Sequence, residues 1–320
     1  MPITEETQLR LAGIPNLTVS SRAPLSGYTR FGIGGPADLL VETASPEGFR
    51  AAVHAARAAA MPVMVIGGGT NLIVSDDGFR GLVLRYNADS ITAKGSTVTA
   101  DAGAVLQDLV DFANQHGLAG VETLAGIPGW VGAAVYGNAG AYGHALGERV
   151  AAVRFFDGER VRVLDNAGCE FRYRESIFKR RKDWIIFSTD LELSVGDAAA
   201  LGGISADILK VRNQKFPPTM KCAGSIFKNF LLRELPDAVA GQVPAAVVRE
   251  GKVPAAWFLE QVGAKGLRRG DIRVADYHAN LIYNDGAGTA RDLCALIADL
   301  KQRVRERFGI EVEEEVQYVG

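Results

Sequence analysis

The sequence predicts a two-domain α+β protein, and three observations lead to this fold class. The chain has 320 residues, and domains average roughly 150 residues, so two domains are expected. Helix-like and strand-like stretches alternate irregularly, without the strict strand–helix–strand order of a doubly wound parallel sheet. Small residues interrupt the pattern between residues 196 and 203. We therefore expect a first domain at residues 1–200 and a second, smaller one at 201–320.

The first half of the chain contains the clearest local signals. Ser45 and Pro46 are typical of an N-cap and a first helical residue, so a helix is expected from Pro46 to about Ala60. Met61 and Pro62 should end it. Further strands are expected at 38–42, 63–66, 82–85 and 97–101, and a helix at 104–116 followed by Gly117.

The second half begins with alternating apolar and polar residues. Residues 150–156 and 160–164 flank Asp157-Gly158, which predicts a hairpin. The remaining expected strands are at 184–193, near 274, at 280–283 and at 310–319, and the remaining expected helices are at 204–214, 254–262 and 289–308. Residues 215–218, Lys-Phe-Pro-Pro, should break the helix that precedes them.

Composition and charge exclude several classes of protein. The chain is 48% hydrophobic and 22% charged, with 35 basic and 37 acidic residues and a net charge of -2, so neither disorder nor a general attraction to nucleic acid is expected. Three scattered cysteines predict a reducing compartment. The N-terminal sequence lacks the apolar run of a signal peptide, and no apolar stretch reaches the length of about 18 residues that spans a bilayer. We therefore expect a cytoplasmic protein that neither crosses nor binds a membrane.

Metal binding is not expected either. The four histidines, at positions 54, 116, 144 and 278, are spread along the chain, and none forms a ligand pair of the HxxxH type. The cysteines do not form a CxxC motif. The sequence thus predicts no metal site.

Two glycine-rich stretches, Gly67–Gly69 and Gly126–Gly143, are the main functional signal. The first follows a predicted strand, but no lysine follows it, so it is not a P-loop. A dinucleotide fingerprint fails at Leu72, and the GxGxxA at residues 32–37 precedes a strand instead of following one. What remains is either tight turns alone or a nest of backbone N–H groups that binds an anion. Two such nests without lysine suit a pyrophosphate bridge, as in a bound dinucleotide.

Seven segments in order resemble one family, the bacterial UDP-N-acetylenolpyruvoylglucosamine reductases. They are YTRFGIGGPADLLVE (28–42), VIGGGTNLIVSD (65–76), GIPGWVGAAVYGNAGAYG (126–143), YRESIFK (173–179), RNQKFPP (212–218), AGSIFKN (223–229) and FGIEVEEEVQYVG (308–320). The resemblance implies a vanillyl-alcohol-oxidase-type FAD-binding domain followed by a smaller α+β substrate-binding domain. It also implies non-covalent FAD, NADPH as co-substrate, and reduction of an enolpyruvyl UDP-sugar in peptidoglycan synthesis.

The same resemblance assigns roles to individual residues. It implies Arg174, Ser225 and Glu315 as catalytic residues, and Lys215 and Asn229 as substrate-binding residues. The implied cofactor-binding residues are Gly67, Gly68, Gly69, Thr70, Asn71, Leu72, Gly126, Ile127, Pro128 and Ala133. Without the resemblance, Arg174 would be a solvated surface residue, Ser225 a cap and Lys215 an exposed helix-end cation.

The chemistry of this reaction suits those residue types. Hydride addition at C3 places negative charge on C2 and the adjoining carboxylate, and the forked guanidinium of Arg174 matches a carboxylate. Ser225 is the expected proton donor to C2. Glu315 would be protonated, or would orient Arg174 or a water. Strand periodicity singles out Glu314, whereas the family motif points to Glu315.

Some features depart from the family pattern. Trp130 replaces a residue that is mostly small, Gly137 replaces a larger one, and residues 276–280 differ from the usual lysine–histidine version. The short stretch between Phe178 and Trp184 indicates the subtype without a lid tyrosine loop. The alternatives are a sugar or alcohol oxidase of the same fold and a non-catalytic flavin-binding module. We expect a monomer.

Overall fold

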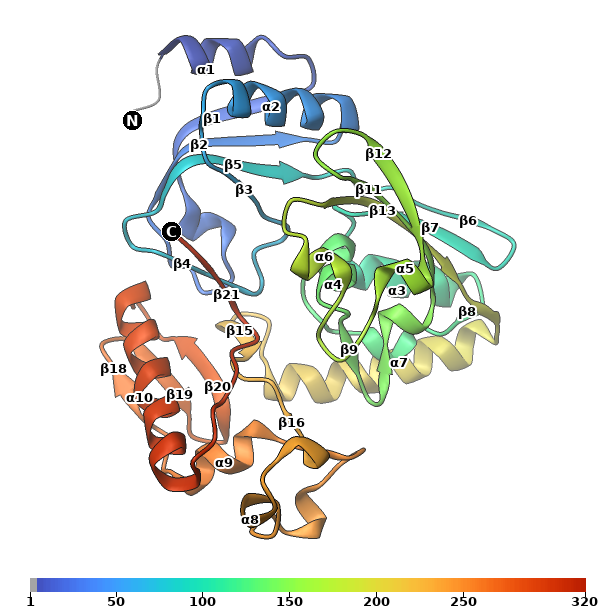
Figure 1. The fold of residues 1–320 in the computed structure, drawn as a ribbon. Helices are drawn as coiled ribbons and strands as arrows, with labels where there is room; N and C mark the ends of the chain where they lie inside the picture. Colours follow the sequence, from blue (N-terminus) through green and yellow to red (C-terminus); the bar gives the residue numbers. More distant parts are fainter. Residues whose placement is uncertain (1–4) are drawn as a thin grey trace. The chain divides into compact units, whose positions relative to one another are not determined.

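The computed structural model describes residues 5–320 (Figure 1). Within it the chain forms two compact units, neither of which is continuous in sequence. The first comprises residues up to 23, 37–69 and 80–218, and the second comprises residues 24–36, 70–79 and 219–320. Residues 1–4 lie outside the described range. They belong to the N-terminal segment in which no signal peptide is expected. None of the helices within residues 5–320 is both long and apolar enough to cross a membrane.

The first unit contains two sheets. One has the strand order β1-β2-β5-β3, with β3 parallel to β5, and the other is antiparallel with the order β12-β11-β13-β7-β6. Their strands are β1 (Thr18–Pro24), β2 (Pro36–Thr43), β3 (Val63–Val65), β5 (Phe79–Tyr86), β6 (Ile91–Lys94), β7 (Thr97–Asp101), β11 (Val150–Phe156), β12 (Val161–Asp165) and β13 (Ile185–Glu192). Short strands β8 (Leu118–Ala119) and β14 (Ser194–Val195) pair together, as do β9 (Gly140–Ala141) and β10 (His144–Ala145).

The helices of this unit cover the sheets and connect them. They are α1 (Glu5–Ala12), α2 (Pro46–Ala58), α3 (Leu106–Gln115), α4 (Val131–Tyr136), α5 (Asn166–Cys169), α6 (Ile177–Arg180) and α7 (Ala198–Lys215). The expected cap of α2 is present, because the Ser45 hydroxyl accepts a hydrogen bond from Gly48 N–H at 3.1 Å. Local capping chemistry was thus sufficient to locate this helix.

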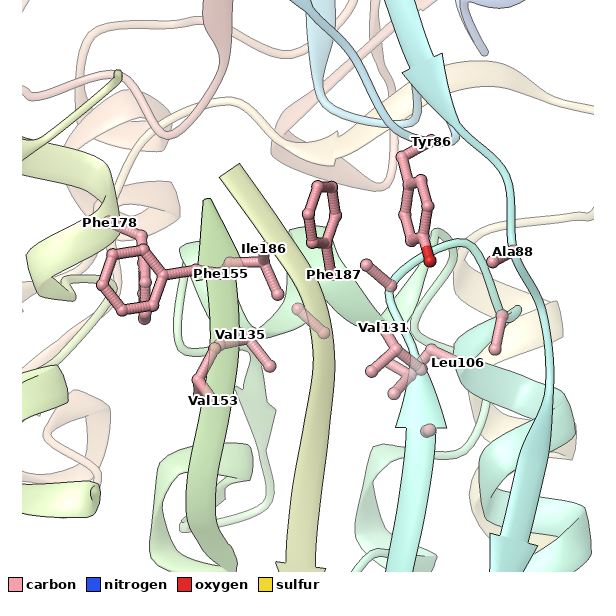
Figure 2. Close-up of a cluster of buried hydrophobic side chains, with 14 of the residues drawn as sticks. Tyr86, Ala88, Leu106, Val131, Val135, Val153, Phe155, Phe178, Ile186 and Phe187 are labelled. Atoms are coloured by element: carbon pink, nitrogen blue, oxygen red, sulfur yellow. The ribbon is translucent and has the colours of Figure 1, made fainter. Parts of the chain in front are cut away.

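Aromatic side chains form the centre of the first unit's core. Figure 2 shows Tyr86 of β5 and Phe187 of β13 next to each other, with ring centroids 4.7 Å apart. Phe49 of α2 meets the Phe187 ring edge-on at 5.5 Å. Phe155 and Phe178 form a second edge-on pair at 5.4 Å in the same picture. These contacts join both sheets and the helix α2 in one core.

Helix α7 differs from the prediction. It begins directly after Asp197, whose carboxylate accepts from Ala200 N–H at 2.7 Å, so Gly202 and Gly203 lie inside the helix instead of in a linker. It ends at Lys215, before the two prolines, as expected. Asn114 of α3 donates to Ser205 of α7 at 2.8 Å, and this holds α7 in the first unit. Along the chain, the last change from the first unit to the second therefore comes after Pro218. The functional division at residues 1–200 and 201–320 stays a prediction.

The second unit is built on an antiparallel sheet with the order β15-β20-β19-β18. Its strands are β15 (Lys221–Ser225), β18 (Arg268–Arg269), β19 (Ile272–Ala275) and β20 (His278–Asn284), with the separate pairs β16 (Phe230–Leu231) with β17 (Lys252–Val253) and β4 (Leu72–Val74) with β21 (Gln317–Val319). Its helices are α8 (Asp237–Ala240), α9 (Ala255–Gln261) and α10 (Ala290–Phe308). Their apolar faces form a core around Phe227, Phe258 and Leu293.

Two features of the second unit could not be read from local sequence. Asp76, in the motif VSD, accepts from the N–H groups of Ala290 and Arg291 at 2.8 and 3.0 Å, so it caps α10 from a distant part of the chain. The expected closing strand at residues 310–319 is wrong in its extent, because only Gln317–Val319 forms a strand, parallel to β4. The side chain of Tyr318, in this short strand, is 48% exposed.

Candidate active site

The glycines at positions 67–69 lie against the start of the second glycine-rich stretch, within the first unit. A Cβ on Gly68 would be 3.1 Å from Cδ1 of Trp130, and a Cβ on Gly67 would be 3.7 Å from Cβ of Ala133. The two glycine-rich stretches, which lie far apart in the sequence, are therefore in contact. In the part of the chain that the structure describes, the N–H groups of Gly67, Gly68 and Gly69 have no protein acceptor.

Trp130, one of the departures from the family pattern, has a defined place in this arrangement. Its ring lies 4.6 Å from the guanidinium carbon of Arg85, which forms an ion pair with Glu42 at 2.5 Å. The indole is thus fixed between a paired cation and the bare backbone of Gly68. Trp130 therefore places a flat apolar side chain against the Gly67–Gly69 stretch.

The second glycine-rich stretch begins in a backbone conformation that favours glycine. Gly126 has a φ of +73°, and a Cβ there would meet Cδ of Arg212 at 3.0 Å and Cδ1 of Leu209 at 3.1 Å. Its N–H donates to Oε1 of Gln107 at 2.7 Å. The neighbouring candidates Ile127 and Pro128 are half-buried and exposed respectively, and Ala133 is exposed. The residues following Gly126 therefore present accessible backbone and small side chains.

These features fit a large flat cofactor with a phosphate bridge such as FAD. Donor groups without a protein acceptor can bind phosphate oxygens, and backbone without side chains allows a ring system to approach closely. The fit rests on Gly67–Gly69 and on residues 126–133. No group of three or more His, Cys, Asp or Glu side chains within the described residues is arranged to hold a metal ion.

Thr70, Asn71 and Leu72, which follow the Gly67–Gly69 stretch, lie in the second unit. Asn71 and Leu72 contact the C-terminal segment there. Leu72 begins β4 opposite Gln317. Nδ2 of Asn71 donates to the main-chain oxygen of Glu315 at 2.8 Å, and its own carbonyl accepts from Gln317 N–H at 2.9 Å. The side chain of Asn71 therefore holds Glu315, while Thr70 and the backbone of this segment stay predicted cofactor contacts.

Arg174 lies in a strained turn of the first unit. Arg172 and Glu175 exchange two backbone hydrogen bonds of 3.0 and 3.1 Å, and Arg174, between them, has a φ of +57°. Such a conformation costs a non-glycine residue about 1–3 kcal/mol and is found most often at functional sites. Nη2 of Arg174 donates to the carbonyl of Gly140 at 3.1 Å, and Lys179 donates to the carbonyl of Arg174 at 2.9 Å. The turn is thus secured on both sides.

Ser225 ends β15, where the strand is irregular. The register between β15 and β20 shifts between Cys222 and Ser225, and Gly224, in between, has a φ of +78° that suits glycine. Ser225 pairs with Leu281 and is half-buried. Of the two default roles, a helix cap or a turn cap, the helix cap does not apply, because the next element after Ser225 is the strand β16.

Glu314 and Glu315 have different environments, which bears on the ambiguity left by the sequence. Both carboxylate oxygens of Glu314 accept from Nζ of Lys301 in α10, at 2.8 and 2.9 Å. Burial raises the pKa of Tyr318 above its ordinary value, and the nearby charge of Glu314 raises it further. The N–H of Glu315, in contrast, donates to the carbonyl of Ile226 at 2.7 Å. The carboxylate of Glu314 thus forms an ion pair with Lys301, whereas the backbone of Glu315 is bound to Ile226, the residue that follows Ser225.

The predicted substrate-binding residues lie in separate units. Lys215 is exposed at the end of α7, with Nζ 5.2 Å from the centre of the Phe216 ring. Asn229 is half-buried, and its Oδ1 accepts from the N–H of Ala255 at the start of α9, at 3.2 Å. Within the second unit the fold thus brings together Ser225 and Glu315, which are 90 positions apart in the chain.

Sequence reasoning missed three residues that support the candidate site. They are Gln107, which fixes Gly126, Lys301, which engages Glu314, and Asn280, which binds the backbone next to Ser225. The available signal for Asn280 was a polar residue inside the apolar strand HANLIYN, because a buried amide needs hydrogen-bond partners.

Comparison with known proteins finds the same family that the sequence motifs resemble, over nearly the whole chain. Residues 37–163 match an FAD-binding domain, and residues 216–319 match the C-terminal domain of UDP-N-acetylenolpyruvoylglucosamine reductase. The reductase of that name from Solibacter usitatus is 74% identical over 98% of this chain and 100% of the relative, and that from Rubrobacter xylanophilus is 36% identical over 93% and 94%. The crystal structure of the Thermus caldophilus reductase aligns with a TM-score of 0.74 at 30% identity, covering 95% of this chain and 100% of that one.

Proposed function

Because the chain belongs to the UDP-N-acetylenolpyruvoylglucosamine reductase family, we propose that Arg174, Ser225 and Glu315 are its catalytic residues. The protein is an FAD-dependent oxidoreductase of peptidoglycan synthesis, with NADPH as reductant and a UDP-sugar enolpyruvate as substrate. The expected fold class, an FAD-binding domain of the vanillyl-alcohol-oxidase type followed by a smaller α+β domain, is confirmed. The oxidase and the non-catalytic module are not supported.

FAD, when bound, would supply the hydride chemistry between NADPH and C3 of the enolpyruvyl group. The protein provides binding and electrostatics. The free N–H groups of Gly67–Gly69 and the backbone around Gly126 would hold the cofactor. This assignment also includes Thr70, Asn71, Leu72, Ile127, Pro128 and Ala133. Asn71 would contribute its backbone, because its side chain binds the main-chain oxygen of Glu315.

Arg174 stabilises the charge that develops when hydride reaches C3. Its guanidinium is a permanent cation whose fork matches the substrate carboxylate, and negative charge builds up there during the reaction. The strained backbone at Arg174 and the hydrogen bonds on both sides of its turn support this role, because they fix the side chain's starting point. Lys215 and Asn229 are proposed to bind the rest of the substrate.

Ser225 donates the proton that C2 needs, and Glu315 orients this end of the site. The observation that carries the proposal is the 2.7 Å hydrogen bond from Glu315 N–H to the carbonyl of Ile226, the residue after Ser225. A serine hydroxyl is a weak acid, yet it can protonate the strongly basic enolate-like intermediate when it is held close to C2. The pairing of Glu314 with Lys301 supports Glu315 as the glutamate involved.

An anaerobic two-step experiment tests the proposal. NADPH should bleach the yellow holoenzyme, and the enolpyruvyl nucleotide should then restore the colour without oxygen. In Ser225→Ala, bleaching should stay near its normal rate, whereas re-oxidation by the nucleotide should be about 10²- to 10⁴-fold slower, the usual contribution of a positioned acid. If both steps slow equally in stopped-flow traces, Ser225 is not the proton donor.

Cytoplasmic location and a monomeric state are part of the same proposal. The free thiols of Cys169, Cys222 and Cys294 support a reducing compartment. Light scattering on the purified holoenzyme should give a mass near the 34.1 kDa of one chain. A mass of twice that value would contradict the monomer.

A further inference from the structure

Asn280 is a polar residue in the centre of an apolar strand. It lies in β20 with only 2% of its surface exposed, between Ala279 and Leu281, which are both fully buried. A buried amide without hydrogen-bond partners destabilises a fold, so the groups that Asn280 binds indicate what its side chain holds in place.

The side-chain amide and the main-chain oxygen of Asn280 bind the two residues that follow Ser225. Nδ2 of Asn280 donates to the carbonyl of Phe227 at 2.8 Å, and Oδ1 accepts from Phe227 N–H at 2.9 Å. The main-chain oxygen of Asn280 accepts from Ile226 N–H at 3.1 Å. One residue thus pairs with three backbone groups of Ile226 and Phe227, and its side chain replaces the partner that a regular strand would supply to Phe227.

This replacement occurs where the regular sheet ends. The register of β15 on β20 is interrupted between Cys222 and Ser225, and the last paired residue is Ser225. Beyond it, the chain is held on one side by Asn280 and on the other by the hydrogen bond from Glu315 N–H to Ile226. Two of the hydrogen bonds that set the path of the chain after Ser225 therefore come from the Asn280 amide.

We infer that Asn280 is a positioning residue, whose side-chain amide sets the backbone after Ser225 and thereby holds the serine hydroxyl where it protonates the substrate. The inference rests on the proposed role of Ser225. Misplacement of a catalytic group by about 1 Å can reduce the rate by about 10²-fold, so loss of the amide should affect the step that uses Ser225.

The same strand provides a matched control. Asn284 lies four positions further along β20 and is 4% exposed. Its Nδ2 donates to the carbonyl of Phe31 at 3.0 Å, and its Oδ1 accepts from the N–H groups of Gly286 and Gly288 at 3.1 and 2.9 Å. It is similarly buried and its side chain also binds backbone groups, but none of these bonds reaches the residues after Ser225.

The test compares Asn280→Asp with Asn284→Asp as FAD-loaded enzymes. In Asn280→Asp a carboxylate oxygen replaces the donor to Phe227, so the bond becomes a repulsion. Re-oxidation by the enolpyruvyl nucleotide should slow about 10- to 100-fold, while reduction by NADPH should change by less than about 3-fold. The solvent deuterium isotope effect on re-oxidation should increase, because proton transfer becomes more rate-limiting. In Asn284→Asp both steps and the isotope effect should stay near wild type.

A double variant shows whether Asn280 acts through Ser225. Adding Asn280→Asp to Ser225→Ala should cause little further loss, because residues that act as one unit are not additive. Equal slowing of both steps, an unchanged isotope effect, or the same defect in Asn284→Asp would overturn the inference. If Ser225→Ala re-oxidises normally, the proposed role of Ser225 fails first. If Ser225→Ala re-oxidises slowly but Asn280→Asp behaves like wild type, the role of Ser225 stands and only the inference about Asn280 fails. Should Asn280→Asp not fold, Asn280→Ser and Asn284→Ser replace the pair with the same criteria.

Discussion

The two compact units hold their candidate site residues in different ways. In the first, the predicted cofactor surface consists of backbone: Gly67–Gly69 offer N–H groups without protein acceptors, and Gly126 is fixed by one side-chain bond from Gln107. In the second, Ser225 and Glu315 are held by the pairing of residues 226–228 with 313–315 and by side-chain amides. A phosphate and a flat ring system require accessible backbone, whereas proton transfer requires a fixed side chain, so each unit uses the means that its task demands.

Arg174 is the exception to this comparison, because it is a proposed catalytic side chain in the backbone-dominated unit. We expect Arg174→Ala to slow re-oxidation by the substrate about 10²- to 10³-fold, the usual effect of removing a charge that stabilises the transition state. The FAD content, measured by absorbance, should be unchanged. Arg174→Gly should show the same kinetic defect but a stability higher than Ala by about 1 kcal/mol, since glycine suits a φ of +57°. Loss of FAD from either variant would make Arg174 structural.

Neutralising the two glutamates separately tests the arrangement of the second unit. Glu315→Gln should slow re-oxidation about 10- to 100-fold. Glu314→Gln loses the ion pair with the partly exposed Lys301, which should lower the free energy of unfolding by about 1 kcal/mol or less and leave turnover near normal. Stopped-flow kinetics and urea unfolding measure the two effects. The opposite ranking would show that the catalytic position has been assigned one residue too late.

A side chain at Gly126 tests the backbone surface of the first unit. Gly126→Ala places a Cβ about where Arg212 and Leu209 already lie, at a φ of +73°. The strain of roughly 1–2 kcal/mol should weaken FAD binding about 10-fold, measured by titrating the apoprotein with FAD. Gly202→Ala is the control, because a Cβ there would meet nothing within 4 Å inside helix α7. Unchanged FAD affinity in Gly126→Ala would remove residues 126–133 from the cofactor surface.

Alkaline pH should weaken the first unit through buried groups. Burial raises the pKa of Cys169 to about 12 and, with the nearby charge of Asp101 adding to it, that of Tyr86 to about 12. The unfolded thiol ionises from about pH 8.5 upward, so the unfolded state then binds fewer protons and stability falls as pH rises towards 12. Cys169→Ala should therefore lose less stability than wild type between pH 8 and 10.5, by about 2.5 kcal/mol, in urea titrations. Parallel curves would contradict a protonated Cys169.

Local chemistry predicted many elements but not their partners. The cap at Ser45, the strand at residues 97–101 and the end of α7 before two prolines follow from neighbouring residues, and each is found as expected. The start of α7 was missed because Gly202 and Gly203 were interpreted as linker residues, although packing of α7 on α3 stabilises a helix despite them.

The candidate residues follow from motif resemblance, whereas strand periodicity alone favours Glu314 over the neighbouring Glu315. Periodicity assumes a regular strand over residues 310–319, but only Gln317–Val319 forms one. The environments of Glu314 and Glu315 differ because Lys301 and Ile226, far away in sequence, approach them. No local pattern contains that information.

The sequence by itself determined the fold class, the family, the cofactor and the glycine stretches, because composition, caps and contiguous motifs are properties of neighbouring residues. Only the tertiary structure decided that Trp130 lies on Gly68, that Asn71 binds Glu315, and that Asn280 supports the chain after Ser225. Each of these contacts joins residues more than 50 positions apart, and such pairs meet only when the whole core has formed around them.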